Sequence, residues 1–206
     1  MSWNFNSNAG GGKKAEFTKF PTGITKIRIL DNAPNIRWVH WMPQFNRSIN
    51  CPGNKVCPIC EIRQQQKANN ENYSYNMSRR FAMNIYNFET KKVEIMEQGV
   101  NFFEDLRDLK GDLEDEGKEL QNAVVKVRRR GTGKDDTSYR LDIEEYNPVN
   151  LEELKEEIID LDEFLKPNEP NDILRLVNGE SWDEVFSKEE GEKEPQDSED
   201  ERVEVR

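Results

Sequence analysis

The chain contains one histidine and three cysteines, and all four lie within 21 residues: His40, Cys51, Cys57 and Cys60. Their spacing is H-x10-C-x5-C-x2-C. The final C-x2-C step carries a proline, which favours a tight turn whose backbone amides face the thiolates. Three thiolates and one imidazole complete a tetrahedral ligand set of the kind found in structural zinc sites, and sulfur ligands favour Zn²⁺ over Mg²⁺ or Ca²⁺. We therefore expect these four residues to bind a zinc ion.

Two other interpretations of these four residues stay open. The cysteines could be buried free thiols beside an incidental histidine, or they could hold an iron–sulfur cluster, although clusters usually take four cysteines. An odd number of cysteines excludes a closed set of intrachain disulfides. Free thiols this close together fit a reducing compartment, so we expect a cytoplasmic protein, in the host cell if the source is viral.

Strands and helices must position this cluster, and alternation of apolar and polar residues predicts the strands. Between residues 24 and 30, Thr25, Ile27 and Ile29 alternate with Lys26 and Arg28, as in a half-buried strand. By the same criterion, strands are predicted at residues 24–30, 35–45, 79–86, 91–96, 123–130 and 137–146. A short helix is predicted at 61–69, after the cysteine loop, and apolar residues at helical spacing predict a second helix at 100–113. The chain should therefore be mainly β (α+β), a five-stranded OB-fold-like antiparallel barrel with an inserted zinc-binding loop and helix.

The sequence divides into four segments. We predict a flexible N-terminal arm (1–16), a zinc-containing OB-fold core (17–150), a helical C-terminal extension (151–186) and a disordered acidic tail (187–206). In the extension, one helix is predicted from an Asn150/Glu153 capping pair and a stripe of Leu151, Leu154, Ile158, Leu161 and Leu165, ending before Pro167. A second capping pair, Ser181 and Glu184, precedes a short element at 182–186.

Charge is distributed unevenly along the 206 residues. The net charge is −11, but residues 151–206 hold 21 acidic and 7 basic side chains, which leaves 20 acidic and 23 basic ones in residues 1–150. A mildly basic body followed by an acidic end fits a nucleic-acid ligand better than the total suggests, although the acidic residues could also serve only to keep a tail solvated. No apolar run approaches the ~20 residues that span a bilayer, so we expect a soluble protein without a membrane partner.

Together these features resemble one family. Trp38–His40–Trp41, the Cys-Pro-x4-Cys-Pro-x-Cys loop, the OB-like strands and the acidic tail are similar to the T-even phage type of single-stranded DNA-binding (helix-destabilising) protein. The resemblance covers residues 15–150 and implies an OB-fold cleft beside a zinc subdomain. It further implies that the protein coats single-stranded DNA in phage DNA replication, recombination and repair, and that its acidic tail recruits replication and recombination proteins.

The sequence departs from that family in two places. The spacing from His40 to Cys57 is shorter than in the family, and residues 1–16 carry only Lys13 and Lys14, whereas the family's longer basic arm drives cooperative binding. We therefore expect a monomer, or weak self-association along DNA.

Sequence-tolerant binding of single strands needs cations for the phosphates and aromatic rings for the bases. If Val125 and Val127 face the core, the basic side chains that alternate with them, Lys126, Arg128 and Arg130, face outward. Alternation on the other strands selects further residues, although any single aromatic could instead belong to the core. The expected DNA contacts are Lys26, Arg28, Arg37, Trp41, Arg79, Arg80, Phe81, Tyr86, Phe88, Lys126, Arg128, Arg130 and Lys134.

We do not expect an enzyme. The single histidine is assigned to the metal, no serine-nucleophile motif occurs, and Gly131-Thr132-Gly133-Lys134 lacks the spacing of a phosphate-binding P-loop. The alternative to single-strand binding is a zinc-containing adaptor or transcription regulator whose basic hairpin contacts duplex DNA or another protein.

Overall fold

The structure is a computed structural model that describes residues 15–133, 136–147, 154 and 156–186. Most of the predicted arm, the start of the predicted extension helix, Lys134 and the acidic tail lie outside these residues. Among the described residues, no helix combines the length and apolar character that a membrane span requires.

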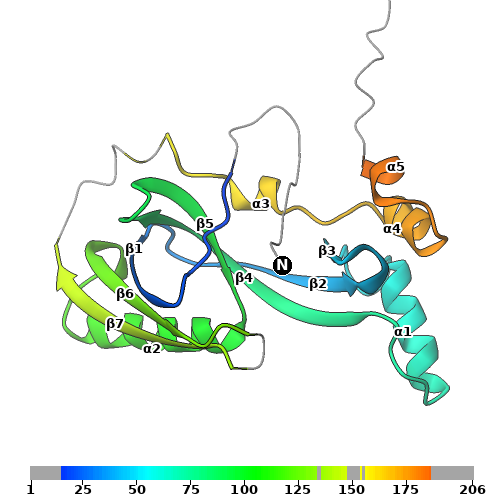
Figure 1. The fold of residues 1–206 in the computed structure, drawn as a ribbon, viewed down its shortest axis with the longest axis horizontal. Helices are drawn as coiled ribbons and strands as arrows, with labels where there is room; N and C mark the ends of the chain where they lie inside the picture. Colours follow the sequence, from blue (N-terminus) through cyan, green and yellow to red (C-terminus); the bar gives the residue numbers. More distant parts are fainter. Residues whose placement is uncertain (1–14, 134–135, 148–153, 155, 187–206) are drawn as a thin grey trace, which may run out of the picture.

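The described residues form a mainly β structure with one antiparallel sheet of seven strands (Figure 1). The strands are β1 (Gly23–Ile29), β2 (Asn35–Met42), β3 (Arg47–Asn50), β4 (Asn76–Asn87), β5 (Lys92–Gln98), β6 (Ala123–Arg130) and β7 (Ser138–Tyr146). The helices are α1 (Pro58–Ala68), α2 (Val100–Asp115), α3 (Leu161–Phe164), α4 (Pro170–Val177) and α5 (Trp182–Phe186), with 3-10 turns η1 (Pro43–Phe45) and η2 (Leu120–Asn122).

Five of the strands form what we call the body: β5, β4, β1, β6 and β7, in that order, with helix α2 packed against them. The expected barrel is not closed, because β5 and β7 do not pair. The outer edge of β5 pairs instead with residues near the N-terminus. The Thr18 amide donates to the Ile95 carbonyl at 2.8 Å, and the Ile95 amide donates to the Glu16 carbonyl at 2.9 Å.

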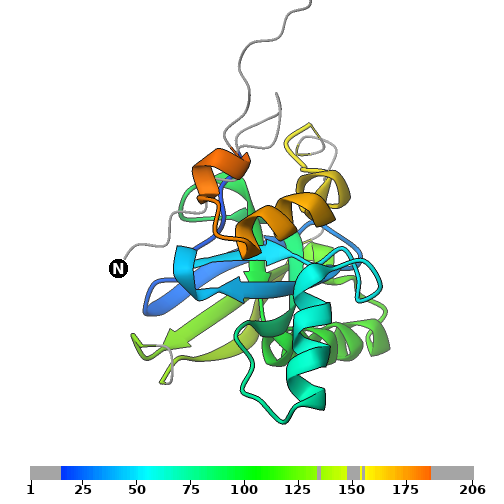
Figure 2. The ribbon, with the colours of Figure 1, turned by 90° about the vertical axis from the view of Figure 1, so that its right-hand side faces the viewer.

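The remaining strands extend the sheet away from the body. β1 and β2 lie end to end along one edge of β4: Ile27 to Ile29 pair with Asn87 to Ile85, and Asn35 to Trp41 pair with Ala82 to Asn76. β3 pairs with the end of β2, and α1 follows it. We call residues 39–76 the metal module; Figure 2 shows it from the side on which α1 lies.

Several predicted boundaries were wrong for local reasons. The strand predicted at 35–45 ends at Met42, because Pro43 begins a 3-10 turn that Asn46 closes with a positive φ of 52°. β3 was not predicted, since four residues are too few to display alternation. Helix α1 begins at Pro58, three residues before the predicted start, with proline at a position where a missing N–H costs nothing.

The single helix predicted across 151–165 is not present in its described part. Leu154 lies in a 3-10 turn, where its carbonyl accepts the amides of Glu157 and Ile158, and the α-helical part is the short α3. Backbone groups that a longer helix would need are bonded elsewhere. The Asn84 side chain accepts a hydrogen bond from the Ile159 amide and donates one to the Ile159 carbonyl. The Asp160 carboxylate then caps the start of α3. The capping pair Ser181 and Glu184 is confirmed by two reciprocal hydrogen bonds at the start of α5.

Candidate functional site

The four predicted ligands meet at one point in the metal module. One side-chain donor atom from each of His40, Cys51, Cys57 and Cys60 lies within 4.8 Å of the other three. The His40 Nε2 atom is 3.5 Å from the Cys57 Sγ and 3.4 Å from the Cys60 Sγ, and the Cys51 and Cys60 sulfurs are 3.6 Å apart. These separations are too long for a disulfide and suit four ligands of one metal ion. The cluster can therefore hold a metal.

Strand β2 and the start of α1 position these ligands. His40 is fully buried in β2, opposite Ile49 of β3. Its Nδ1 has no hydrogen-bond partner among the described residues, so packing sets the orientation of the ring. In the loop, Gly53 adopts a φ of 109°, which only glycine takes readily, and its carbonyl accepts the Cys57 amide at 3.0 Å. Cys57 is the N-cap of α1, where the helix dipole favours a thiolate.

The thiol pKa values reflect how closely the sulfurs are packed. A hydrogen bond with the Cys51 sulfur, together with burial, raises the pKa of Cys57 to about 11. The same bond lowers the pKa of Cys51, and burial raises that of Cys60. Because metal ligation requires thiolates, a bound cation replaces the protons that these sulfurs would otherwise share.

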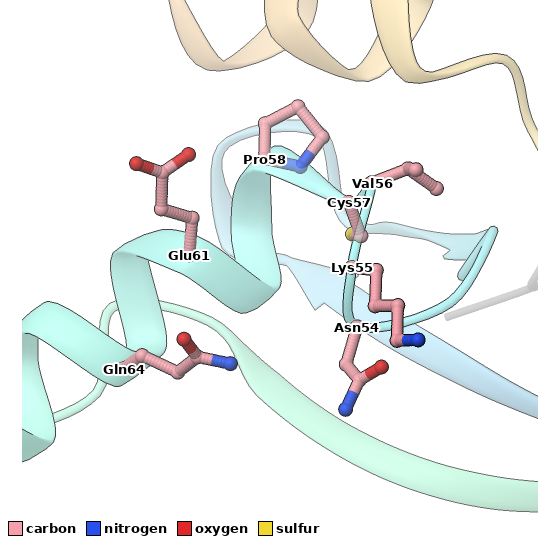
Figure 3. A pocket seen from close by; sticks show the side chains of 7 residues that line it. All are labelled: Asn54, Lys55, Val56, Cys57, Pro58, Glu61 and Gln64. Carbon is pink, nitrogen blue, oxygen red and sulfur yellow. The ribbon is translucent and has the colours of Figure 1, made fainter.

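The outer wall of the ligand loop borders a surface hollow of about 420 Å³. Figure 3 shows the loop residues across from the first turns of α1. Its lining is Asn54, Lys55, Val56, Cys57, Pro58, Glu61 and Gln64. Cys57 is the one residue of the four that lines this hollow; His40, Cys51 and Cys60 are not among its lining residues.

The interior of the metal module is built around the ligands. Cys57 and Cys60 pack with Met42, Ile49 and Ile59, and the cluster is completed by Ile173 and Leu176 of α4. Two side chains of the C-terminal extension therefore belong to this core. Trp182 of α5 adds an outer layer, with its ring 5.9 Å from that of Phe45 and the Arg47 guanidinium 4.9 Å from its centroid.

Two of the expected DNA-contacting residues, Arg79 and Phe81, lie on the core face of β4. Phe81 is buried in the body and stacks on Phe103 of α2 at 5.1 Å between ring centroids. Arg79 is exposed, with its guanidinium 5.1 Å from the Phe81 centroid. Arg79 therefore marks the point where the core face emerges into solvent.

Beyond Arg79, that face carries large apolar side chains open to solvent. Ile36 pairs with Phe81, Trp38 with Arg79 and His40 with Met77, so all six side chains share one face. Ile36 is 56 % exposed, Trp38 47 % and Met77 39 %. We call Ile36, Trp38, Met77 and Arg79 the exposed stripe. It lies between the part of this face that α2 covers and the part occupied by the metal ligands.

Arg37 and Arg80 lie on the opposite face of the sheet. They pair directly across β2 and β4, and both contact the Glu97 carboxylate: Arg37 hydrogen-bonds it, and the Arg80 Nε is 3.9 Å away. Burial lowers the pKa of Arg37, which the charge of Glu97 partly offsets. Arg37 thus has a structural partner, and it does not share a face with the exposed stripe.

The expected bases of β1 and β6 lie on the outer face of the body. Val125 and Val127 are buried as predicted, so Lys126 and Arg128 point outward. Acidic residues of β7 accompany them: Asp142 pairs across from Lys126, and Glu144 forms a 2.9 Å salt bridge with Lys26. This face therefore carries mixed charge.

Arg28 was expected outside, and the structure buries it. Its side chain is 4 % exposed and donates to the Asn147 carbonyl at 3.3 Å. Burial lowers its pKa, against the opposing charge of Glu145. Its guanidinium lies 5.9 Å from the ring of Phe88, which in turn contacts Tyr86 edge-on.

The remaining residues expected to contact DNA do not lie together. Trp41 is half-buried on the face opposite His40, and Arg130 is exposed at the end of β6. Lys134 lies outside the described residues. Ile36, Trp38 and Met77, which the structure leaves exposed, are not among the residues expected from the sequence. A signal for Trp38 existed, because it is two residues before His40 and must share its face.

A scan of the sequence against protein-family models gives no match, and a search of curated proteins gives none either.

Proposed function

We propose that the protein binds single-stranded DNA without sequence preference, through the exposed stripe. The observation that carries this proposal is the exposure of Ile36, Trp38 and Met77 beside Arg79 on one strand pair. Exposed aromatic and apolar side chains stack on bases of any sequence, and arginine supplies both phosphate contact and a plane for stacking. Isolated exposed apolar residues are common, but a row of them at a junction indicates a binding surface.

The order of strands in the body supports the proposal. Strands β1, β4, β5, β6 and β7, with α2 before the last two, follow the chain order expected of an OB-fold. In that fold the second and third strands, together with the loops after the first and fourth, bind oligonucleotides. Here the loop after the first strand contains the whole metal module, and the second strand, β4, carries Met77 and Arg79.

We propose zinc as the metal. A tetrahedron with bonds of about 2.3 Å to sulfur and about 2.0 Å to nitrogen has edges of about 3.8 Å between sulfurs and about 3.5 Å between sulfur and nitrogen. Here the Cys51 and Cys60 sulfurs are 3.6 Å apart, the His40 Nε2 is 3.5 Å from the Cys57 sulfur and 3.4 Å from the Cys60 sulfur, and all four ligand atoms lie within 4.8 Å of one another. A bound zinc ion would supply structural cross-linking, holding the loop to β2 so that Trp38 and Met77 stay in place.

In this proposal the protein coats and protects single strands during DNA replication, recombination and repair, and its acidic tail recruits other proteins of those processes. The negative charge of residues 151–206 supports recruitment by the tail. DNA repels an acidic segment, so the segment stays available to bind basic surfaces of other proteins.

Titration with oligonucleotides tests the function. The expected result is quenching of tryptophan fluorescence by unstructured single strands of unrelated sequence, with equal affinity for each and an affinity that falls with salt. The matched duplexes serve as controls. Preference for a duplex, or for one sequence, would overturn the proposal in favour of a zinc-containing adaptor or transcription regulator.

A further inference from the structure

The sheet narrows where the metal module joins the body. β3 pairs with β2 from Val39 onward, and the next residue, Cys51, still donates its amide to the Trp38 carbonyl at 2.8 Å; β5 pairs with β4 only from Phe81 onward. At Arg37 and Arg80 the sheet is therefore two strands wide. A two-stranded ribbon twists more and resists bending less than a wider sheet. The exposed stripe lies on one face of this narrow region, so any bending there changes its shape.

A segment of the C-terminal extension crosses the other face of the narrow region. We call residues 159–168 the strap. In Figure 1 the chain runs from α3 toward α4 on one side of the β2–β4 pair, while α1 and α2 lie on the other side; Figure 2 shows the same separation. Leu161 and Leu165 of the strap pack on Ala82 and Ile95 of the body.

Asn84 and Asn35 hold the first part of the strap to the sheet. Asn84 is 1 % exposed, and its side chain donates to the Ile159 carbonyl at 3.0 Å and accepts the Ile159 amide at 3.1 Å. The Asn35 side chain donates to Asp162 at 2.7 Å. The buried Asn84 amide fixes the position of the strap, because breaking either of its bonds to Ile159 leaves an unpaired polar group; the Asn35–Asp162 bond is exposed and holds the strap less firmly.

Asn50 holds the second part of the strap to the metal module. Its side-chain amide donates to the carbonyls of Leu165 and Lys166, both at 3.1 Å. Its backbone amide donates to the Asn168 side chain at 2.7 Å, and its carbonyl accepts the Asn168 amide at 3.1 Å. Its side-chain oxygen accepts from the Arg37 Nε at 2.9 Å, and Arg37 also binds Glu97 of the body. Asn50 thus links the metal module, the strap and, through Arg37, the body.

We propose that the strap fixes the angle between the metal module and the body, and thereby the shape of the exposed stripe on the opposite face. Asn84, Asn50 and Arg37 are then positioning residues for DNA binding that touch no DNA. This inference rests on the proposed function for its DNA part, but the geometric part stands independently. Preorganisation of this kind strengthens binding, because the cost of ordering the surface is met before the ligand arrives.

The geometric part is tested by measuring the separation of the two halves in the full chain. Spin labels are placed through non-canonical residues at Gln64, exposed on α1, and Thr132, exposed in the β6–β7 loop, which leaves the cysteines untouched. The N84A variant should broaden the distribution of distances. N35A removes the exposed hydrogen bond to Asp162. It should keep the fold and broaden the distance distribution less than N84A does. L113A is the control, since Leu113 is buried in the body core away from the strap.

The DNA part is tested on the same variants without labels. N84A should bind single-stranded oligonucleotide about fivefold more weakly, N35A by a smaller factor, and L113A as the unchanged protein does, all with unchanged metal content. Unaltered distance distributions in both asparagine variants, or equal broadening in L113A, would overturn the inference. If the unchanged protein binds no single-stranded DNA, the proposed function fails, while the distance measurement still decides whether the strap holds the two halves.

Discussion

The body and the metal module are stabilised in different ways. The body buries a continuous apolar core in which Ile27, Ile85, Met96, Phe102 and Val125 come from four strands and a helix. The module has a smaller buried core, and two of its members, Cys57 and Cys60, belong to the candidate metal cluster. Small cores are marginal without a metal or another cross-link. We therefore predict that the body folds through burial alone, whereas the module needs a bound metal and the packing of α4 to fold.

Removing a ligand should have the largest effect. Structural zinc sites contribute an apparent free energy on the order of 10–16 kcal/mol at neutral pH. C57S should therefore unfold the module, and hydrogen exchange should show lost protection at Ile49 and Ile59. Protection at Ile27 and Val125 in the body should remain. Equal loss in both regions would show that they are one cooperative unit.

A cavity in the core of the body tests the converse, that the body can be destabilised without loss of metal from the module. Phe103 is buried against Phe81, and F103A should lower the free energy of unfolding by about 3–5 kcal/mol, as large-to-small substitutions of buried aromatics do. Denaturant unfolding measures this loss. Metal content, determined on the same samples, should not change. Loss of metal in F103A would contradict the separation of the two regions.

The junction between the regions should carry more DNA affinity than the outer face of the body. W38A removes the largest side chain of the exposed stripe and should weaken single-strand binding by about 1–3 kcal/mol. F88A removes an exposed ring from the body and should change it little. Fluorescence anisotropy of labelled oligonucleotide compares the two. A larger loss of affinity in F88A than in W38A would indicate that DNA binds to the body and not to the exposed stripe.

The acidic tail should have the smallest effect. Residues 187–206 hold nine acidic and four basic side chains, and they follow α5, which packs on the metal module. If they compete with DNA for the cations of the binding surface, deleting them should tighten binding at low salt, and the gain should disappear at high salt. Unchanged affinity at low salt would exclude this competition.

The metal cluster and most strands could be predicted because their signals are local. Every soft ligand of the chain lies between His40 and Cys60, and alternation marks β1, β4, β6 and β7. Helix α2 follows from its 3.6-residue period. None of these depends on which segments meet in space.

What could not be predicted depends on distant partners. The exposure of Trp38 follows from β2 running past the end of the body, beyond the cover of α2. Arg28 is buried beside Asn147, whose carbonyl accepts a hydrogen bond from its guanidinium although the two residues lie 119 apart in the sequence. The predicted long helix is interrupted because Asn84 and Asn50 bind its backbone across more than 70 residues of sequence. Alternation gives the face of a residue but not what covers that face.

The most direct test of the binding surface uses the indole N–H signals of the tryptophans in an NMR spectrum. Trp38 is 47 % exposed on the stripe, whereas Trp182 packs between Phe45 and Phe186 on the far side of the metal module. Adding a short single-stranded oligonucleotide should shift or broaden the Trp38 signal and leave that of Trp182 in place. An unmoved Trp38 signal at saturating oligonucleotide would contradict the proposal that the exposed stripe binds single-stranded DNA.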